Sequence, residues 1–393
     1  MAFIGAGFMN TFHAKSWTAV RDSEIVAVCS ASLQHARTLA ELCVDRNVGS
    51  PNCYTDVSAT VRDPSVDAVW ISVPNDLHLP LTRTICEEKM QGKSNLRAIA
   101  CEKPLALDVP QAKEMVRLVE KAGLLHGYLE NQVYAPSLVR GKEIIWSRTR
   151  DAGRPYLARA SEEHSGPHEP WFWQRHRSGG GVLIDMMCHT LEATRFLLTA
   201  PKENKSDLTV KSVSAETANL KWTRPEYVER LRDSTHGQVD YSKDAAEDFA
   251  RASITYEDKD GTALIAENTV SWCFDGPGVR LSFELLGPEY HMQVNSLEPE
   301  LHVFLGRNLK PKPNEYLVEK QAAEQGLMPT VADETFTYGY QNENSHMVSC
   351  FLGDRMPSES WYDGLFIQRL MAACYTAAEK GTKLPYPPAD LED

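Results

Sequence analysis

Hydrophobic positions in the first 130 residues follow two alternating patterns along the chain. Short apolar runs predict buried strands, and segments in which apolar residues recur every three or four positions predict amphipathic helices. The predicted strands lie at residues 1–4, 24–29, 66–74, 96–101 and 124–129, and the predicted helices at residues 8–20, 33–46, 78–90 and 109–122. Strands that alternate with helices of this length build a parallel, doubly wound sheet, so the predicted fold class is α/β.

The pattern changes after Glu130. Helical periodicity is found at residues 137–147, 181–198, 342–352 and 364–380, and polar excursions at residues 224–248 and 310–314. Alternating or β-branched runs predict a large, mostly antiparallel open sheet with one covered face, with strands at residues 155–162, 209–216, 250–256, 262–272, 280–287, 290–294 and 300–304. We expect two domains, residues 1–130 and 131–393, with the C-terminal helix able to pack back on the first.

Composition and charge exclude several classes of protein. With 393 residues the chain can build two full cores, and its formal charge of −13 argues against nucleic acid or an anionic membrane surface as the main partner. No apolar stretch approaches the roughly 18 residues of a membrane-spanning helix, and the start does not resemble a secretion signal, so we expect a cytoplasmic protein. The nine cysteines include no C-x-x-C pair, which indicates core residues rather than disulfides or a metal site.

The first strand runs directly into Gly5-Ala6-Gly7 and then into a predicted helix. This is the context of a dinucleotide-binding turn, in which Gly5 permits the tight turn and Gly7 lets a pyrophosphate approach the helix N-terminus. Asn10 stands at the position of the third glycine of that fingerprint, so an ordinary strand-to-helix turn is the alternative. The strand is short, and we expect that residues usually found before it have been either lost or omitted from this sequence.

A lysine follows the apolar run at residues 96–101, within Glu102-Lys103-Pro104. Pro104 biases Lys103 away from helix, so the lysine leaves the carboxyl end of a sheet strand, where open α/β sheets bind ligands. The alternative is a solvated loop lysine.

A second polar group stands in the glycine-rich segment at residues 179–189. Three glycines open a predicted helix, and Asp185 and His189, four positions apart, share one face of it. Either the two side chains satisfy each other in a core, or the carboxylate holds a neutral imidazole that acts as a general base.

Together these residues resemble the Gfo/Idh/MocA family of sugar and polyol dehydrogenases, named for glucose-fructose oxidoreductase and inositol dehydrogenase. The motifs that carry the resemblance extend over nearly the whole chain: Gly5-Ala6-Gly7, Pro74-Asn75-x-x-His78, Glu102-Lys103-Pro104, Glu130-Asn131, Asp185-x-x-x-His189 and Pro357-x-x-x-Trp361-x-Asp363-Gly364. The family implies a Rossmann domain followed by an α/β domain whose open sheet forms a homodimer or homotetramer interface.

The resemblance also implies roles for individual residues. Lys103, Asp185 and His189 look like the catalytic set: His189 accepts a proton from a substrate hydroxyl, Lys103 stabilises the charge on that oxygen, and Asp185 holds the substrate and His189 in place. The implied cofactor-binding positions are Gly5, Gly7, Phe8, Met9, Ser30, Pro74, Asn75, His78, Glu102 and Asn131. For Asn75 and His78 the alternatives are a turn after Pro74 and a helix cap. No role requires a metal.

The end of the second strand bears on the choice between NAD and NADP. Residues 29–32 include no acidic side chain for a ribose 2′-hydroxyl, whereas Ser30 and Ser32 could face a 2′-phosphate with help from His35 or Arg37. We therefore expect NAD or NADP, with a slight preference for NADP.

Substrate contacts are expected in the aromatic and histidine-rich segment at residues 162–177. Aromatic faces and many hydrogen-bonding groups suit a sugar ring, so His164, Trp173 and Arg175 are the preferred contacts. The alternative is a surface loop that its tryptophans anchor to the second domain.

The resulting prediction is an NAD(P)-dependent dehydrogenase or reductase for a secondary hydroxyl of a sugar, glycoside or inositol. One alternative is a glycosidase that uses bound NAD for transient oxidation and elimination. The other is a catalytically silent, dinucleotide-sensing regulator, which would not need Lys103, Asp185 and His189 together.

Overall fold

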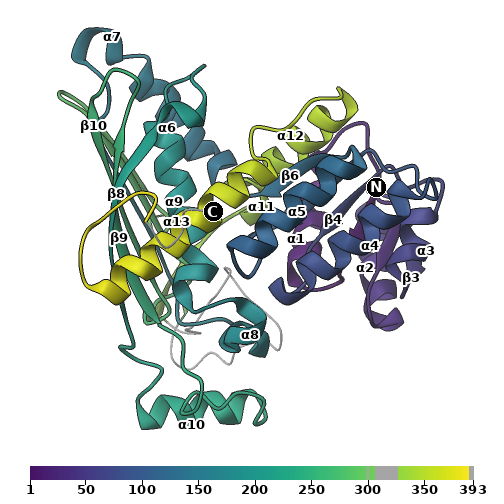
Figure 1. The fold of residues 1–393 in the computed structure, drawn as a ribbon. Helices are drawn as coiled ribbons and strands as arrows, with labels where there is room; N and C mark the ends of the chain where they lie inside the picture. The colour runs from purple at the N-terminus through teal and green to yellow at the C-terminus, as the bar shows by residue number, and fades with distance from the viewer. Residues whose placement is uncertain (299–300, 306–325, 389–393) are drawn as a thin grey trace. The chain divides into compact units, whose positions relative to one another are not determined.

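The chain forms two compact units in the computed structural model, which describes residues 1–298, 301–305 and 326–388 (Figure 1). The first unit comprises Met1–Ala135 and Tyr338–Gln368, and the second Pro136–Thr337 and Arg369–Asp393. Residues 338–368, which the sequence analysis assigns to the second domain, thus group with the first unit. The excursion expected at residues 310–314 lies outside the described residues.

The first unit is built on a six-stranded parallel sheet in the order β3-β2-β1-β4-β5-β6. Its strands are β1 (Ala2–Ile4), β2 (Ala27–Cys29), β3 (Asn52–Tyr54), β4 (Ala68–Ile71), β5 (Ala98–Glu102) and β6 (Leu125–Leu129). The strand order reverses between β1 and β4, and such a switch point opens a crevice at the carboxyl ends of the strands. The predicted doubly wound α/β sheet is confirmed.

Local sequence signals account for the helices of this unit. They are α1 (Phe8–Ser16), α2 (Leu33–Asp45), α3 (Val57–Arg62), α4 (His78–Met90), α5 (Val109–Ala122) and α12 (Tyr340–Leu352). Asp108 caps α5 by accepting a hydrogen bond from the Gln111 amide at 2.9 Å, and Gly123 ends the helix with φ +64°. The predicted bounds of α4 and α5 are confirmed. Helix α1 ends earlier than predicted because Trp17–Ala19 tightens into a 3₁₀ helix.

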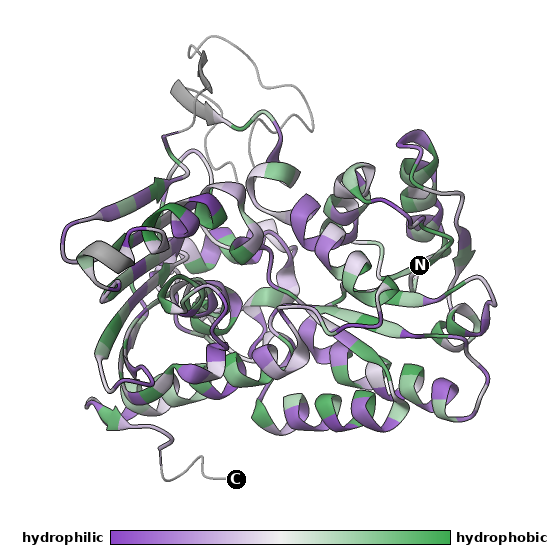
Figure 2. Ribbon diagram, turned by 90° about the horizontal axis from the view of Figure 1, so that it is seen from above, coloured by the Kyte–Doolittle hydropathy of each residue, from purple (hydrophilic) through white to green (hydrophobic). Residues whose placement is uncertain are grey.

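The helices and the sheet of this unit enclose one hydrophobic cluster around Ile71, Ile99 and Val119. All five residues of β5 are buried, as expected for a strand with both faces covered. Figure 2 shows helices striped in both colours, as amphipathic helices with one buried side require.

The buried imidazole of His126 on β6 makes the stability of this unit depend on pH. Its Nδ1 accepts a hydrogen bond from the Trp361 amide at 3.0 Å, and burial lowers its pKa from 6.5 to about 4. Between these values the unfolded chain binds a proton that the folded chain does not. The free energy of unfolding is therefore expected to fall by about 3 kcal/mol as the pH drops from 6.5 to 4.

Denaturant titrations of the parent and of His126→Asn across this range measure the effect. The asparagine amide lies near the place of Nδ1, so its oxygen keeps an acceptor for the Trp361 amide but does not titrate, and the variant should lose less stability on acidification. Equal pH dependence in both proteins would show that His126 is not responsible.

The second unit holds a seven-stranded mixed sheet in the order β12-β11-β7-β10-β9-β8-β15. Its strands are β7 (Leu157–Glu163), β8 (Thr209–Ala218), β9 (Phe249–Glu257), β10 (Ala263–Ser271), β11 (Arg280–Leu286), β12 (His291–Asn295) and β15 (Leu384–Pro385), and β13 (Leu301–Leu305) pairs separately with β14 (Gly326–Thr330). Only β7 and β10 are parallel neighbours in the larger sheet, so the predicted mostly antiparallel sheet is confirmed.

One face of this sheet is covered by helices (Figure 1). The remaining α-helices among the described residues are α6 (Pro136–Trp146), α7 (Thr149–Ala152), α8 (Arg175–Ser178), α9 (Val182–Leu198), α10 (Pro225–Ser234), α11 (Glu334–Thr337) and α13 (Trp361–Lys380). Helix α9 packs on β7 and β10 and is buried almost all round. The polar insert predicted at residues 224–248 contains α10.

Within the described residues, no helix combines the length and the hydrophobicity that crossing a membrane demands. The nine cysteines are free thiols, and all except Cys53 and Cys273 are buried, as expected for small core residues.

Candidate active site

The glycine turn after β1 has the geometry of an open anion-binding loop. Gly5 has φ +105°, and a Cβ atom there would lie 2.1 Å from the carbonyl oxygen of Ser72. Gly7 precedes α1, and a Cβ atom there would meet no atom within 4 Å. Gly5 is thus required for the approach of β1 to the end of β4, whereas Gly7 leaves space beside the N-terminus of α1, where a pyrophosphate could bind.

Asn10 explains how the turn tolerates the loss of the third fingerprint glycine. Its buried side-chain amide donates hydrogen bonds to the carbonyl oxygens of Gly5 at 2.8 Å and Ile4 at 3.3 Å. The side chain therefore ties the first turn of α1 to the end of β1. Phe8 is 52% exposed and Met9 is partly exposed, so the residues of the first unit leave both predicted cofactor positions open to a ligand.

The end of β2 offers hydroxyl groups. Ser30 is partly exposed, and its Oγ accepts a weak hydrogen bond from the Ser32 amide at 3.3 Å. Ser32 caps α2 by accepting from the His35 amide at 3.3 Å. His35 and Arg37 are exposed on the first turns of α2.

The turn after β4 is held by His78. Its buried ring places Nδ1 3.1 Å from the carbonyl oxygen of Leu105 and Nε2 3.0 Å from that of Val73, and burial lowers its pKa. Both nitrogens therefore face the main chain, and the ring connects this turn to the segment after Lys103. Asn75, also buried, begins the 3₁₀ helix Asn75–Leu77 directly after Pro74.

Lys103 follows the last residue of β5 and is half-buried. Its main-chain amide donates a hydrogen bond to Oε2 of Glu102 at 3.2 Å, and its peptide bond to Pro104 is cis. Because β1, β4, β5 and β6 are parallel neighbours, Gly5, Asn75, Lys103 and Asn131 all lie at the carboxyl edge of one sheet.

Asn131 follows β6 at this edge. Its Nδ2 donates a hydrogen bond to the carbonyl oxygen of Tyr338 at 2.7 Å, where the C-terminal part of the first unit begins. Gly339 has φ +93°, and a Cβ atom there would lie 2.2 Å from the carbonyl oxygen of Asn131. Residues 338 and 339, which are more than 200 positions away in the sequence, thus pack against Asn131 at the carboxyl end of β6.

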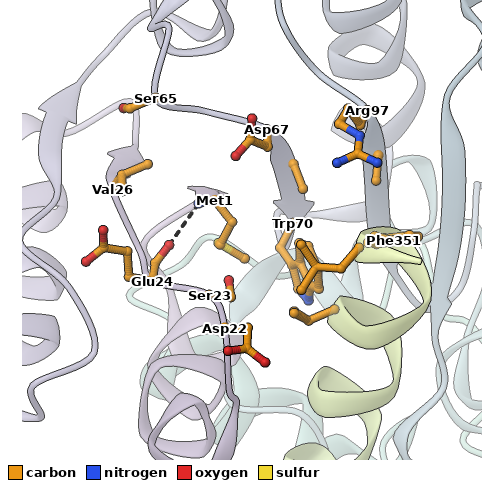
Figure 3. Close-up of a pocket in the computed structure, with 14 residues that line it drawn as sticks. Met1, Asp22, Ser23, Glu24, Val26, Ser65, Asp67, Trp70, Arg97 and Phe351 are labelled. Carbon is orange, nitrogen blue, oxygen red and sulfur yellow. Dashed lines mark hydrogen bonds between the residues drawn. The ribbon is translucent and has the colours of Figure 1, made fainter. Parts of the chain in front are cut away.

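A cavity of about 450 Å³ in the first unit lies elsewhere (Figure 3). Met1, Asp67 and Arg97 line it at the amino ends of the strands, together with Trp70 and Phe351, and the Met1 ammonium donates to the carbonyl oxygen of Glu24 at 2.8 Å. Dinucleotides bind at the carboxyl ends of parallel strands, so this cavity is not the cofactor site.

In the second unit, the glycines before α9 accommodate protein rather than ligand atoms. A Cβ atom on Gly181 would lie 2.2 Å from the carbonyl oxygen of Glu247. Oε1 of Glu247 accepts hydrogen bonds from the amides of Gly181 at 3.1 Å and Leu183 at 3.2 Å, and from the Tyr375 hydroxyl at 2.6 Å. Burial nevertheless raises the pKa of this carboxyl group. Glu247 caps α9, a role that the sequence analysis missed because no local signal connects it to residue 181.

Asp185 and His189 lie one turn apart on α9, and both are buried. Oδ2 of Asp185 accepts a hydrogen bond from the indole nitrogen of Trp272 at 3.2 Å. Trp272 directly follows β10, so the sheet holds the carboxylate from one side. Trp272 was not identified from the sequence.

The aromatic segment before α9 packs its central tryptophan inward. Trp173 is 3% exposed, donates to the carbonyl oxygen of Pro167 at 3.1 Å, and has ring-centroid distances of 4.8 Å to Trp222 and 5.0 Å to Trp272. This geometry favours the alternative interpretation of Trp173, in which the tryptophan anchors the segment to the second domain and does not contact substrate.

The other two predicted substrate contacts differ in exposure. The buried His164 ring accepts a hydrogen bond at Nδ1 from the Gly166 amide at 3.0 Å, whereas Arg175 is exposed at the start of α8. A cavity of about 350 Å³ lies along this segment, and its lining includes Ser165, His168 and His236.

Comparison with protein families supports this description. Residues 1–128 match the model described as "Oxidoreductase family, NAD-binding Rossmann fold", and residues 146–289 match "GFO/IDH/MocA C-terminal domain". The chain belongs to the Gfo/Idh/MocA family. The resemblance inferred from its motifs is therefore confirmed.

The similarity of this chain to individual relatives is low and covers only part of each sequence. It is 30% identical over 177 residues to 1,5-anhydro-D-fructose reductase of Ensifer adhaerens, covering 44% of this chain and 49% of that protein. It is 29% identical over 218 residues to D-glucoside 3-dehydrogenase of Escherichia coli, covering 55% and 57%. The matched region thus spans about half the length of these relatives.

The fold is also found in solved structures. GenD2 from gentamicin A biosynthesis, in complex with NAD, superposes with a TM-score of 0.77 at 22% identity, covering 98% of this chain and 95% of that one. At this identity the likeness concerns the fold.

Proposed function

We propose that this protein is an NAD(P)-dependent oxidoreductase that transfers a hydride between a nicotinamide cofactor and a secondary hydroxyl of a sugar, glycoside or inositol. The carrying observation is that the glycine turn after β1 and Lys103 after β5 lie at one edge of the same parallel sheet. The names of two relatives, 1,5-anhydro-D-fructose reductase and D-glucoside 3-dehydrogenase, agree with this substrate class.

The cofactor would be held by residues of the first unit. The open space beside Gly7 and the N-terminus of α1 suit a pyrophosphate, and Asn75, Lys103 and Asn131 stand at the edge that a nicotinamide would reach. When bound, the nicotinamide supplies the hydride chemistry, and the protein supplies position and electrostatics.

Three residues carry the proposed proton and charge chemistry. His189 accepts the proton of the substrate hydroxyl during oxidation and returns it during reduction. Lys103 donates a hydrogen bond to the same oxygen and stabilises its developing negative charge. Asp185, held by Trp272, orients the substrate and His189.

The substrate side is proposed to include the segment with His164, Trp173 and Arg175. Arg175 is exposed and carries planar hydrogen-bond donors suited to hydroxyl groups, while the packing of Trp173 and the capped ring of His164 hold the segment in shape.

The absence of an acidic side chain at residues 29–32 supports a preference for NADP. Ser30 would face the 2′-phosphate, and the exposed His35 and Arg37 would add positive charge or hydrogen-bond donors.

Assembly and location are further proposals. The face of the seven-stranded sheet opposite α9 carries exposed cross-strand ion pairs, such as Arg159 with Glu267 at 2.6 Å and with Glu284 at 3.2 Å. Following the family resemblance, we propose that this polar face pairs with a second copy in a homodimer or homotetramer. We also propose a cytoplasmic location, from the sequence alone.

A substrate panel tests the proposed function. The purified protein is incubated with sugars, inositols and glycosides and with either NAD⁺ or NADP⁺, and the absorbance of the reduced nicotinamide is followed. We expect reduced cofactor to accumulate with at least one polyhydroxylated substrate, and NADP⁺ to show the lower KM. Release of free sugar without accumulation of reduced cofactor would instead indicate the glycosidase, and binding without turnover the regulator.

A further inference from the structure

A buried hydrogen-bond network connects the C-terminal part of the first unit to the strand end that carries Lys103. It contains His13 from α1, Glu102 from β5 and Asn344 from α12, with Ser16 and Trp70 beside them, and all five side chains are buried. Each of these five residues is more than 50 positions away in the sequence from at least one of its partners. No local sequence pattern therefore indicates the network.

The orientation of the Asn344 amide follows from its contact with Trp70. The indole nitrogen of Trp70 lies 2.9 Å from Oδ1 of Asn344. An indole N–H can only donate, so the atom that faces it must be the amide oxygen. The amide nitrogen therefore faces the other way, toward His13.

The Asn344 amide in turn determines which ring nitrogen of His13 carries a hydrogen. Nδ2 of Asn344 lies 3.0 Å from Nδ1 of His13 and 2.8 Å from the hydroxyl of Ser16, which donates its own hydrogen to the His13 carbonyl oxygen at 2.8 Å. Nδ1 of His13 must accept, and the hydrogen of the ring is on Nε2.

The Nε2 hydrogen of His13 is directed at the glutamate next to Lys103. Nε2 lies 2.9 Å from Oε1 of Glu102, and the other oxygen, Oε2, accepts from the Lys103 main-chain amide at 3.2 Å. One carboxylate thus joins α1, the helix of the glycine turn, to the main chain of Lys103.

We infer that His13 and Asn344 are positioning residues that set the location of Lys103 relative to the cofactor helix. Asn344 holds His13 in the tautomer that donates to Glu102, and Glu102 holds the Lys103 main chain. A lysine that must reach one substrate oxygen depends on such support, because small misplacements of a catalytic group cost large factors in rate. The inference rests on the proposed role of Lys103.

Two substitutions of similar chemistry separate positioning from a general structural role. The side-chain nitrogen of glutamine reaches approximately the place of histidine Nε2, so His13→Gln keeps a donor for Glu102. The shorter side chain in His13→Asn places its amide near Nδ1 and leaves Oε1 of Glu102 without a donor. We expect the rate of hydride transfer to fall by about tenfold or more in His13→Asn and by a clearly smaller factor in His13→Gln, with similar cofactor dissociation constants. Equal rates in the two variants would overturn the inference.

NMR spectroscopy determines the tautomer of His13 independently of any measurement of enzyme activity. In ¹⁵N-labelled parent protein, the His13 ring resonances, assigned through bonds from the sequential backbone assignment of the parent, should show the hydrogen on Nε2. A hydrogen on Nδ1 would overturn the inference even if both variants failed to fold. If Lys103 proved dispensable for turnover, its role in the proposed function would be wrong. The spectrum would still show whether His13 donates to Glu102, so the two failures can be distinguished.

Discussion

Lys103→Met is expected to lower the rate of hydride transfer by about 100- to 1,000-fold, the cost of removing one preorganised donor from a developing oxyanion. Methionine has a similar length and flexibility but no hydrogen-bond donor, so the substrate oxygen loses its stabilising partner. The main-chain contact to Glu102 involves the amide of residue 103 and is retained, so the cofactor site should keep its shape. Stopped-flow absorbance of the nicotinamide under single-turnover conditions measures the step directly.

Cofactor affinity provides the internal check of this experiment. Titration of protein fluorescence with NADH and NADPH should give dissociation constants close to those of the parent. Lys121→Met, an exposed position on α5, is the matched control and should keep the parental rate. A parental rate in Lys103→Met would remove Lys103 from the mechanism.

His189→Ala is expected to reduce kcat by about 100- to 10,000-fold, the range observed when a positioned general base is lost. The hydroxyl proton then has no acceptor in place, so the reaction depends on hydroxide and the residual rate should rise steadily with pH. The parent should instead reach a plateau once the imidazole is neutral. Profiles of kcat against pH for the two proteins provide the comparison.

The exposed His291 on β12 supplies a matched control, since His291→Ala removes an imidazole of the same unit without touching α9. Retention of the parental rate and pH profile in His189→Ala would exclude this residue as the base. A loss of rate with an unchanged profile would assign it to positioning, leaving the proton to another group.

The elements that the sequence predicted best are those with local signals. Helices α4 and α5 were predicted with their observed bounds. For α5, Asp108 caps the first turn, Pro110 lies within that turn and Gly123 ends the helix. The short strand β3 and helix α3 were not predicted, because a strand of three exposed or partly exposed residues and a helix of six residues carry too little pattern to be distinguished from a loop.

The residues of the candidate site also fall into two groups, those in short sequence motifs and those that only the folded chain brings together. The glycine turn, Glu102-Lys103-Pro104 and the Asp185–His189 pair are short motifs. Together they carry the family resemblance, and that resemblance implied dinucleotide-dependent chemistry. Glycines that open a helix permit close approach of either main chain or cofactor, and residues 179–181 by themselves do not indicate which of the two packs there. The structure places Glu247 there.

By itself, the amino-acid sequence determined the α/β class, the alternation of strands and helices, and the identity of Lys103, Asp185 and His189 as candidates. These follow from periodicity and short-range motifs, which are properties of neighbouring residues. Only the tertiary structure decided which side chains support them. Asn344 meets His13 across 331 positions, Trp272 meets Asp185 across 87, and Glu247 meets Gly181 across 66. Such pairs are created by the packing of distant elements into one core, and no local pattern of hydrophobic and polar residues specifies them.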